Sequence, residues 1–197
     1  MSKIHFHRRN LPHLYFNEGI YFITYRLANS LPIKKVAEIK TVIKKKDRQD
    51  DENFKRSFKK YDTILNGGLH GNKYLINPKV AEICKYTLHY PDGKDYKLIC
   101  YCIMPNHIHL VFKLLSENKS ISRIMQSIKR TSARKSNMIL NRAGKFWQDE
   151  SYDRLVRDDK ELYFIIKYVL MNPVNAGLTN NWNSWEYSYC DPNYLVL

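Results

Sequence analysis

The sequence has no Cys-X-X-Cys pair, no apolar run of about 18 residues and no apolar segment at its amino terminus. Without such a pair, the four cysteines do not form a zinc ribbon or a thioredoxin-type redox motif. Without the apolar segments, the sequence shows neither a signal peptide nor a membrane-spanning helix. We therefore predict a cytoplasmic protein with no membrane partner, whose thiols are reduced: Cys84, Cys100, Cys102 and Cys190.

Glycine and proline are also scarce, with seven residues of each among 197, while 44% of the residues are hydrophobic. This composition excludes the disordered and fibrous classes and is typical of a folded protein. A chain of this length is long enough for one sizeable core and short for two. We predict a single domain over residues 1–197, with a charged helical insertion at about residues 44–60, where both signs of charge are dense.

Acidic residues are few relative to basic ones. The chain has 19 Asp and Glu against 33 Lys and Arg, which leaves a formal net charge of +14. A charge of this size attracts polyanions and raises the rate at which they are encountered, so nucleic acid is the expected partner. The alternative is that the charge only solvates the surface.

The order of the predicted elements indicates an α+β fold. Short segments rich in aromatic and β-branched residues predict strands, and apolar residues three or four apart predict helices. The last helix is predicted to begin after Asp158, with Glu161 completing the cap, and to stop before Asn172-Pro173. Two consecutive central strands predict a hairpin, so we expect an antiparallel sheet with helices packed on it. The predicted strands are residues 20–27, 96–104, 107–114 and, with a weaker pattern, 142–147 and 152–156; the predicted helices are residues 78–89, 120–140 and 158–171.

Two histidines interrupt the apolar stretch IMPNHIHLVFKL, residues 103–114. Alternate residues of a strand share one face, so His107 and His109 point to one side and the apolar residues beside them to the other. Two imidazoles on one face can lean toward one cation. The alternative is a pair of partly exposed histidines that water or backbone satisfies. The same spacing in His5-Phe6-His7 lies in a basic terminus where we expect no strand and assign no chemistry.

A metal held by two histidines needs a third ligand, and the last predicted helix offers one. Tyr168 and Asn172 lie four residues apart at the edge of its apolar stripe, so the Asn172 amide oxygen can complete a site with the histidines. A tyrosine becomes a nucleophile toward phosphodiesters once a neighbouring cation favours its phenolate. The chain has 15 tyrosines, most of which are expected to be structural, and position makes Tyr168 the candidate.

Three segments together resemble a known family. They are Pro-Asn-His-Ile-His-Leu at residues 105–110, FWQDESYDRLVRD at residues 146–158 and YVLMNPVNAGL at residues 168–178. In this combination the chain is similar to single-tyrosine transposases of the HUH class, above all to the REP-associated tyrosine transposases and related transposases of bacterial insertion sequences. The resemblance extends from residue 19 to about residue 185.

The resemblance implies a ferredoxin-like antiparallel sheet with packed helices, the fold of HUH endonucleases. It implies that His107 and His109 hold a divalent metal, that Tyr168 is the nucleophile and that Asn172 completes the metal site. The implied reaction cuts and rejoins single-stranded DNA next to a hairpin, through a covalent 5′-phosphotyrosine and a free 3′ hydroxyl. The implied partner is single-stranded DNA with a hairpin, and a homodimer is one assembly to consider.

Two of these expectations have an alternative: which metal is bound, and whether the protein is an active enzyme. Two imidazoles and an amide suit zinc or nickel by ligand preference, whereas the resemblance implies Mg²⁺ or Mn²⁺, with oxygens of phosphate and water filling the shell. We expect Mg²⁺ or Mn²⁺. The rival to an enzyme is a catalytically inactive or domesticated nucleic-acid-binding protein with a regulatory role. A relaxase or replication initiator of the same chemical class is expected to have a longer chain.

The first long helix after the histidine strand carries a basic stripe opposite its apolar face. Arg123, Arg130 and Arg134 recur on one side of this helix, with Lys129 and Lys135 beside them. We expect these five residues to contact the DNA backbone, where each neutralised phosphate steepens the salt dependence of binding. The alternative is a solvated helix face.

Overall fold

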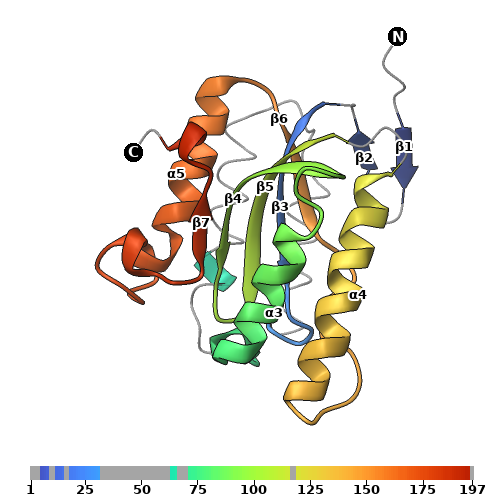
Figure 1. The fold of residues 1–197 in the computed structure, drawn as a ribbon, viewed down its shortest axis with the longest axis vertical. Helices are drawn as coiled ribbons and strands as arrows, with labels where there is room; N and C mark the ends of the chain where they lie inside the picture. Colours follow the sequence, from blue (N-terminus) through green and yellow to red (C-terminus); the bar gives the residue numbers. More distant parts are fainter. Residues whose placement is uncertain are drawn as a thin grey trace.

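The computed structural model describes residues 5–8, 12–15, 18–31, 63–65, 71–115 and 119–195. The predicted insertion at residues 44–60 lies outside the described residues, and the single domain over the whole chain stays a prediction. In Figure 1 the strands run side by side through the centre of the molecule, with helices α3 and α4 in front of them and α5 at the left.

Five strands form one antiparallel sheet in the order β6-β3-β5-β4-β7. The central strands β4 and β5 form the predicted hairpin, and β3 pairs with the other side of β5. Helix α3 lies between β3 and β4 in the chain and α4 between β5 and β6, which is the βαββαβ order of a ferredoxin-like fold. The predicted α+β fold with a ferredoxin-like antiparallel sheet is therefore confirmed. The strands are β3 (Ile20–Arg26), β4 (Tyr96–Ile103), β5 (His107–Leu114), β6 (Tyr152–Val156) and β7 (Ser188–Cys190).

A separate two-stranded ladder joins β1 (His5–Arg8) to β2 (Pro12–Tyr15). The expectation that no strand contains His5 and His7 is therefore wrong. Pairing needs only a second extended segment to supply backbone partners, and the basic, unpatterned composition of this terminus does not prevent it.

Each long helix begins at a side chain that satisfies the free N–H groups of its first turn. Asn77 opens α3 by accepting from the N–H of Lys79 at 3.0 Å, and Ser120 opens α4. As predicted, Asp158 opens α5, with its Oδ1 accepting from the N–H of Glu161 at 2.7 Å. No helix among the described segments is both long and apolar enough to cross a membrane. The helices are α3 (Pro78–His89), α4 (Ile121–Ile139) and α5 (Asp159–Asn175), with 3-10 turns at Tyr74–Ile76, Trp182–Ser184 and Pro192–Tyr194.

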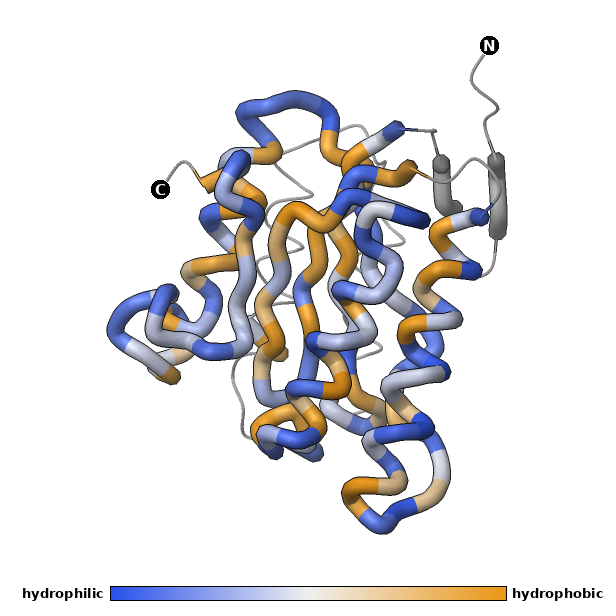
Figure 2. Tube along the Cα trace, in the orientation of Figure 1, coloured by the Kyte–Doolittle hydropathy of each residue, from blue (hydrophilic) through white to orange (hydrophobic). Residues whose placement is uncertain are grey.

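The sheet separates two apolar cores. Helices α3 and α4 pack on one face, against Ile108 and Leu110 of β5 among others. Helix α5 packs on the other face through Leu162, Ile166 and Val169. Each such side chain stabilises the fold by roughly 1.5 to 3 kcal/mol when fully buried. Figure 2 shows the corresponding concentration of apolar residues along the central strands.

Helix α5 continues past Pro173, so its predicted stop before Asn172-Pro173 is wrong. Pro173 lacks only its own N–H, and the Asn172 carbonyl still accepts a helical bond from the N–H of Ala176 at 3.0 Å. The helix ends instead at Asn175, and Gly177, two residues later, has a φ of 68°, the left-handed conformation that closes many helices. Asn172 therefore lies within the helix, one turn after Tyr168.

Residues 142–147 do not form the strand that their pattern weakly predicted. Asn141 and Gly144 have φ values of 47° and 87°, and these left-handed conformations interrupt an extended backbone. An isolated bridge joins Trp147 to Leu27 at the end of this segment. Local turn chemistry therefore overrides the aromatic and basic residues that suggested a strand.

Lys129 on α4 is tied to the loop that precedes β6. Its ammonium group donates to the carbonyls of Gln148 and Asp149, each at 3.1 Å, and to the Ser151 hydroxyl at 2.6 Å. Burial lowers the pKa of Lys129 to about 8. The prediction that Lys129 contacts DNA is therefore not supported by its position, because its charged end is engaged within the protein.

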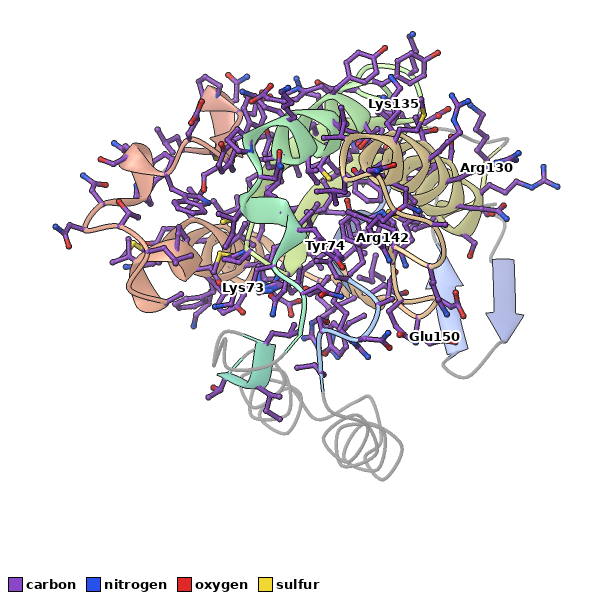
Figure 3. All side chains as sticks on the ribbon, turned by 90° about the horizontal axis from the view of Figure 1, so that it is seen from below. Lys73, Tyr74, Arg130, Lys135, Arg142 and Glu150 are labelled. Atoms are coloured by element: carbon purple, nitrogen blue, oxygen red, sulfur yellow. The ribbon has the colours of Figure 1, made fainter. Side chains whose placement is uncertain are left out.

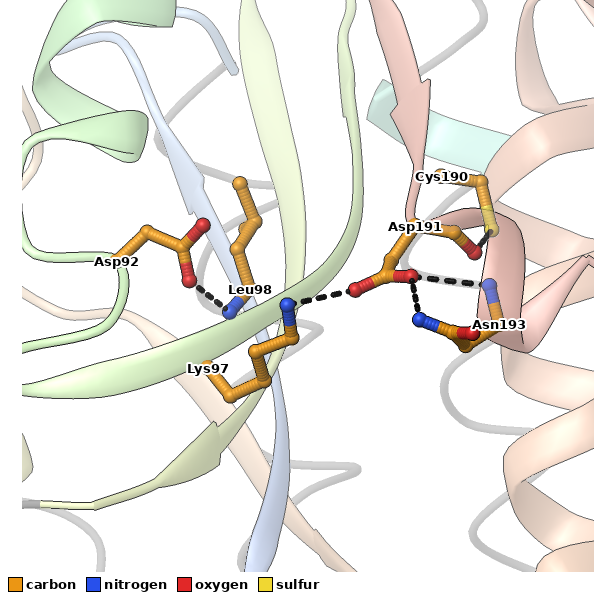
Figure 4. A network of polar contacts seen from close by, with 6 residues as sticks. All are labelled: Asp92, Lys97, Leu98, Cys190, Asp191 and Asn193. Atoms are coloured by element: carbon orange, nitrogen blue, oxygen red, sulfur yellow. Dashed lines mark hydrogen bonds and ion pairs between the residues drawn. The ribbon is translucent and has the colours of Figure 1, made fainter.

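Asp191 connects the segment after β7 to the neighbouring strand β4 (Figure 4). Its Oδ2 lies 2.8 Å from Lys97 Nζ, and its Oδ1 accepts from the backbone and side-chain N–H groups of Asn193, both at 2.9 Å. Lys97, followed by the Asn193 N–H, holds the pKa of the Asp191 carboxyl below its usual range. In the same view, Asp92 accepts from the N–H of Leu98 at 2.8 Å. These carboxylates anchor β4 at both of its flanks.

Replacing Asp191 with Asn removes the charge but keeps the size and one acceptor. We expect the free energy of unfolding at pH 7 to fall by roughly 0.5 to 1.5 kcal/mol. A carboxyl whose pKa is lower in the folded protein than the ordinary value of about 3.9 stabilises the fold above that value. This contribution is lost as the pH falls through the folded pKa, so the stability difference between wild type and Asp191→Asn, measured by urea denaturation, should shrink as the pH falls below about 4. The exposed acid Glu186, changed to Gln, is the control; a difference that does not shrink with falling pH would contradict the assignment.

Replacing Lys129 with Met should change how stability depends on pH. The pKa of Lys129 is lower in the folded protein, about 8, than in the unfolded chain, so the folded state binds fewer protons above pH 8. Wild-type stability should therefore rise relative to Lys129→Met by about 2 kcal/mol between pH 8 and pH 10. Urea denaturation across this range measures the difference. The variant Arg130→Met should follow the wild type, and parallel curves for Lys129→Met would show that the amine is not buried as described.

Candidate active site

Strand β5 presents two imidazoles on the face of the sheet that α5 covers. His107 and His109 are both 0% exposed, and their Nε2 atoms lie 3.0 Å apart. The ring centroids are 4.6 Å apart and the planes meet at 81°. The two side chains share a face, as the alternation predicted, and they are buried rather than partly exposed.

The outer nitrogen of each imidazole contacts a neighbouring polar side chain. Asn106 Oδ1 lies 2.6 Å from His107 Nδ1, while Asn106 Nδ2 donates to the carbonyl of Leu65 at 3.1 Å. Because the amide nitrogen faces Leu65, the amide oxygen accepts from His107, whose proton is then on Nδ1. Thr24 Oγ1 lies 2.8 Å from His109 Nδ1, since the register of β3 and β5 places Thr24 opposite His109.

These contacts decide where the lone pairs point. With its proton on Nδ1, His107 directs a lone pair from Nε2 toward His109. The Thr24 hydroxyl can either donate to His109 Nδ1 or accept from it, so His109 can take either tautomer. When Thr24 accepts, both Nε2 lone pairs face each other across 3.0 Å, an arrangement that a shared cation stabilises. The donor set therefore fits a metal ion.

Helix α5 places Tyr168 against this pair. The ring centroids of Tyr168 and His109 lie 5.5 Å apart, and Phe22 packs against both rings, 6.2 Å from Tyr168 and 5.8 Å from His109. Asn172, which is 0% exposed, donates from Nδ2 to Tyr168 Oη at 3.1 Å. An N–H aimed at the phenol oxygen stabilises negative charge there. The structure thus brings Tyr168, Asn172 and the two histidines together.

A third protein ligand of the usual acidic or thiol type is not offered here. Among the residues that the structure describes, no group of three or more His, Cys, Asp or Glu side chains is arranged to hold a metal ion. Cys102 pairs with His109 across the strands, and Cys100 lies two residues earlier; neither of these two cysteines forms a disulfide. Burial raises the pKa of the Cys100 thiol well above its ordinary value, which disfavours the thiolate that zinc prefers. Asn172, whose Nδ2 contacts Tyr168, carries an amide oxygen, a type of ligand that hard cations bind.

Four of the five basic residues predicted as DNA contacts are exposed on α4: Arg123, Arg130, Arg134 and Lys135. Figure 3 shows Arg130 and Lys135 on the outer side of this helix, and Lys135 Nζ lies 5.0 Å from the ring centroid of Tyr86 on α3. We call these four residues the basic row. Because α4 and α5 pack on opposite faces of the sheet, the basic row and the imidazoles lie on opposite faces as well.

Thr24 and Asn106 are not among the site residues that the sequence predicts. Thr24 has a weak signal as a polar residue within an apolar strand, and Asn106 has one as an amide directly before His107. Neither signal indicates which side chain the residue contacts in the folded protein. Thr24 and His109 are 85 residues apart in the chain, so only the pairing of β3 with β5 brings them together.

Comparisons with known proteins found a similar sequence and a similar fold. A protein of Haemophilus influenzae that carries the name REP-associated tyrosine transposase is 28% identical over 109 residues, which are 51% of this chain and 60% of that protein. The matched stretch thus spans less than two thirds of the relative's length. A solved structure of a REP-associated tyrosine transposase bound to a REP hairpin covers 95% of this chain and 82% of its own, with a TM-score of 0.55 and 15% identity. At that identity the likeness establishes the fold alone.

A family described as "Transposase IS200 like" matches residues 69–172, which is more than half of the chain. The matched stretch contains all four residues that meet between β5 and α5: His107, His109, Tyr168 and Asn172. The chain therefore belongs to the IS200-like transposase family.

Proposed function

We propose that this protein is a metal-dependent DNA transposase that cuts and rejoins single-stranded DNA through a covalent 5′-phosphotyrosine. The observation that carries the proposal is the meeting of two distant segments: the Tyr168 ring lies 5.5 Å from His109, whose Nε2 lies 3.0 Å from that of His107. Membership of the IS200-like transposase family supports the same reading. A phenol beside a candidate cation site is the arrangement that attack on a phosphodiester requires.

Tyr168 is the proposed nucleophile. Its Oη attacks the phosphorus and releases the phenolic proton to water, and the bond between phosphorus and the 3′ oxygen breaks. That oxygen takes up a proton and leaves as a 3′ hydroxyl, while the 5′ phosphate stays on the tyrosine. Rejoining reverses these steps, with a 3′ hydroxyl attacking the phosphotyrosine. The N–H that Asn172 donates to Oη stabilises the developing negative charge on the attacking oxygen.

His107, His109 and Asn172 are the proposed ligands of a divalent metal, Mg²⁺ or Mn²⁺. When bound, such a cation supplies positive charge that polarises the scissile phosphate. Asn106 and Thr24 hold the outer nitrogens of the imidazoles and so orient the rings. The Asn172 amide nitrogen donates to Tyr168, and an amide oxygen is the hard type of ligand that Mg²⁺ prefers.

Single-stranded DNA with a hairpin is the proposed substrate. The related solved structure is of a transposase bound to a REP hairpin, and the basic row of this chain supports contact with a nucleic-acid backbone. We propose that the hairpin stem lies against the basic row and that the adjoining single strand reaches Tyr168. Because these two sites lie on opposite faces of the sheet, the strand between them has to pass over a sheet edge. The homodimer stays a prediction.

Changing Tyr168 to Phe should abolish covalent attachment while leaving DNA binding nearly unchanged. Phenylalanine keeps the ring against His109 and Phe22 but has no oxygen to attack phosphorus. The measurement is a denaturing gel of protein incubated with labelled hairpin oligonucleotides that copy the repeats flanking the gene. The matched control is Tyr163→Phe, which alters a tyrosine that is 36% exposed on the same helix and should retain adduct formation.

Two outcomes of that assay would count against the proposal. Cleavage by Tyr168→Phe at the wild-type rate would remove Tyr168 from the mechanism. A wild-type protein that binds the hairpin tightly but never cleaves it would favour the regulatory nucleic-acid-binding alternative.

Changing both His107 and His109 to Ala should suppress cleavage by about 100-fold or more, even at high magnesium, because the proposed cation loses its two imidazoles. Binding of Mn²⁺, followed by electron paramagnetic resonance, should be lost in parallel. His89→Ala is the control, since His89 lies on α3 and contacts Tyr101 at 3.3 Å on the other face of the sheet. Unchanged cleavage or unchanged Mn²⁺ binding in the double variant would make the two histidines structural.

A further inference from the structure

Arg26 is a buried arginine on the same face of the sheet as the imidazoles. It is the last residue of β3, its side chain is only 6% exposed, and the register pairs it with His107. Thr24, two residues earlier, shares this face and contacts His109. Side chains at directly facing positions of two antiparallel strands have their Cβ atoms about 5 Å apart. The Arg26 side chain therefore starts beside the His107 side chain.

Among the described residues, the hydrogen bonds of Arg26 are all to neutral oxygen atoms. Its Nη1 donates to the Ser30 hydroxyl at 3.2 Å and to the Leu27 carbonyl at 3.5 Å. Across the part of the chain that the structure describes, no Asp or Glu forms an ion pair with it. The described contacts engage only Nη1, although a guanidinium carries five N–H donors on three nitrogens.

A second arginine on this face, Arg154, has the carboxylate partner that a buried arginine usually has. Arg154 of β6 is 7% exposed, pairs with Phe22 of β3 in the ladder, and donates from Nε to Glu161 at 2.5 Å. Its charge is thereby neutralised by a carboxylate of α5. Arg26 and Arg154 thus have the same residue type and nearly the same burial on one sheet face, yet only Arg154 has a carboxylate partner among the described residues.

A buried charge without a counter-ion is costly, and arginine is rarely buried unless it is paired. An anionic ligand removes this cost, and phosphate matches the fork of N–H donors on a guanidinium. We propose that Arg26 binds a phosphate group of the DNA at the histidine pair. This inference rests on the proposed function for the identity of that phosphate as the scissile one or its immediate neighbour. The guanidinium would donate to a non-bridging oxygen and neutralise charge that develops during attack.

The hydrogen bonds from Nη1 to Ser30 and Leu27 have a role in this arrangement. They hold one end of the guanidinium against the turn that follows β3, so the planar group is oriented before the ligand arrives. A preoriented donor loses less conformational freedom on binding than a free side chain does. Lysine at this position would keep the charge but lose the fork, so the two residue types should differ in function.

The first test measures binding of inorganic phosphate without any DNA. Thermal unfolding is followed while phosphate replaces chloride at constant ionic strength, in wild type, Arg26→Gln and Arg26→Lys. Phosphate should raise the melting temperature of the wild type, and its apparent affinity should be at least about tenfold weaker in Arg26→Gln, with Arg26→Lys in between. Arg157→Gln, a change of an exposed arginine, is the control and should keep the wild-type response.

The result that overturns the inference is a phosphate response that is absent in the wild type or equal in wild type and Arg26→Gln. Should Arg26→Gln fail to fold, Arg26→Lys keeps the charge, and its weaker response to phosphate than the wild type supports the inference. An equal response in that variant overturns it.

The second test separates this inference from the proposed function. Covalent adduct formation with the hairpin oligonucleotide should fall at least about tenfold in Arg26→Gln. Tyr168→Phe, which cannot form an adduct, should keep the wild-type response to inorganic phosphate. If neither the wild type nor any variant cleaves DNA but phosphate binding still depends on Arg26, the phosphate site is supported and the proposed strand cleavage is contradicted. If Arg26→Gln forms the adduct at the wild-type rate, the proposed strand cleavage is supported and the proposed role of Arg26 is contradicted.

Discussion

The pleat of β5 separates two kinds of side chain that need different surroundings. Ile108 and Leu110 lie in the core under α3 and α4, while His107 and His109 lie under α5. A slip of one residue in the pairing would exchange the two sets and bury the imidazoles among apolar residues. The large apolar core therefore holds the histidine pair in register, although it takes no part in the chemistry.

The continuation of α5 through Pro173 has a similar consequence for the phenol. Because the helix does not stop at Asn172, this residue stays one turn from Tyr168, and its Nδ2 reaches the phenol oxygen at 3.1 Å. Apolar contacts of Leu162 and Val169 fix the helix on the sheet, which sets the position of the Tyr168 ring against His109. The site thus depends on a helix whose two ends are determined by an Asp cap and a left-handed glycine.

Two buried cations and one half-buried cation in this protein are stabilised in three different ways. Lys129 donates to two carbonyls and a hydroxyl of one loop, and burial lowers its pKa. Arg154 is neutralised by Glu161 of α5. Arg26 has only neutral partners among the described residues, and it is the one that faces His107. The difference lies in what each cation meets in the folded protein, since all three are ordinary basic residues in the sequence.

Local signals were enough for much of the fold and for the choice of site residues. The helix at residues 78–89 and the strand at residues 107–114 follow from the local sequence, because Pro at the first turn of a helix and the alternation of a strand act over a few neighbouring residues. The local sequence also determined that His107 and His109 share a face. Their roles as ligands, and that of Tyr168 as nucleophile, remain proposals.

Other features depended on segments that are far apart in the chain. Contacts between distant segments bring Thr24 to His109, direct Lys129 to the loop before β6 and bury Arg26 opposite His107. A register shift between Leu98 and Cys100 likewise changes which face the later residues of β4 occupy. The physical reason is that the residues adjacent in the sequence determine to which face of a strand or helix a side chain points. Strand pairing and helix packing determine which other side chains that face contacts.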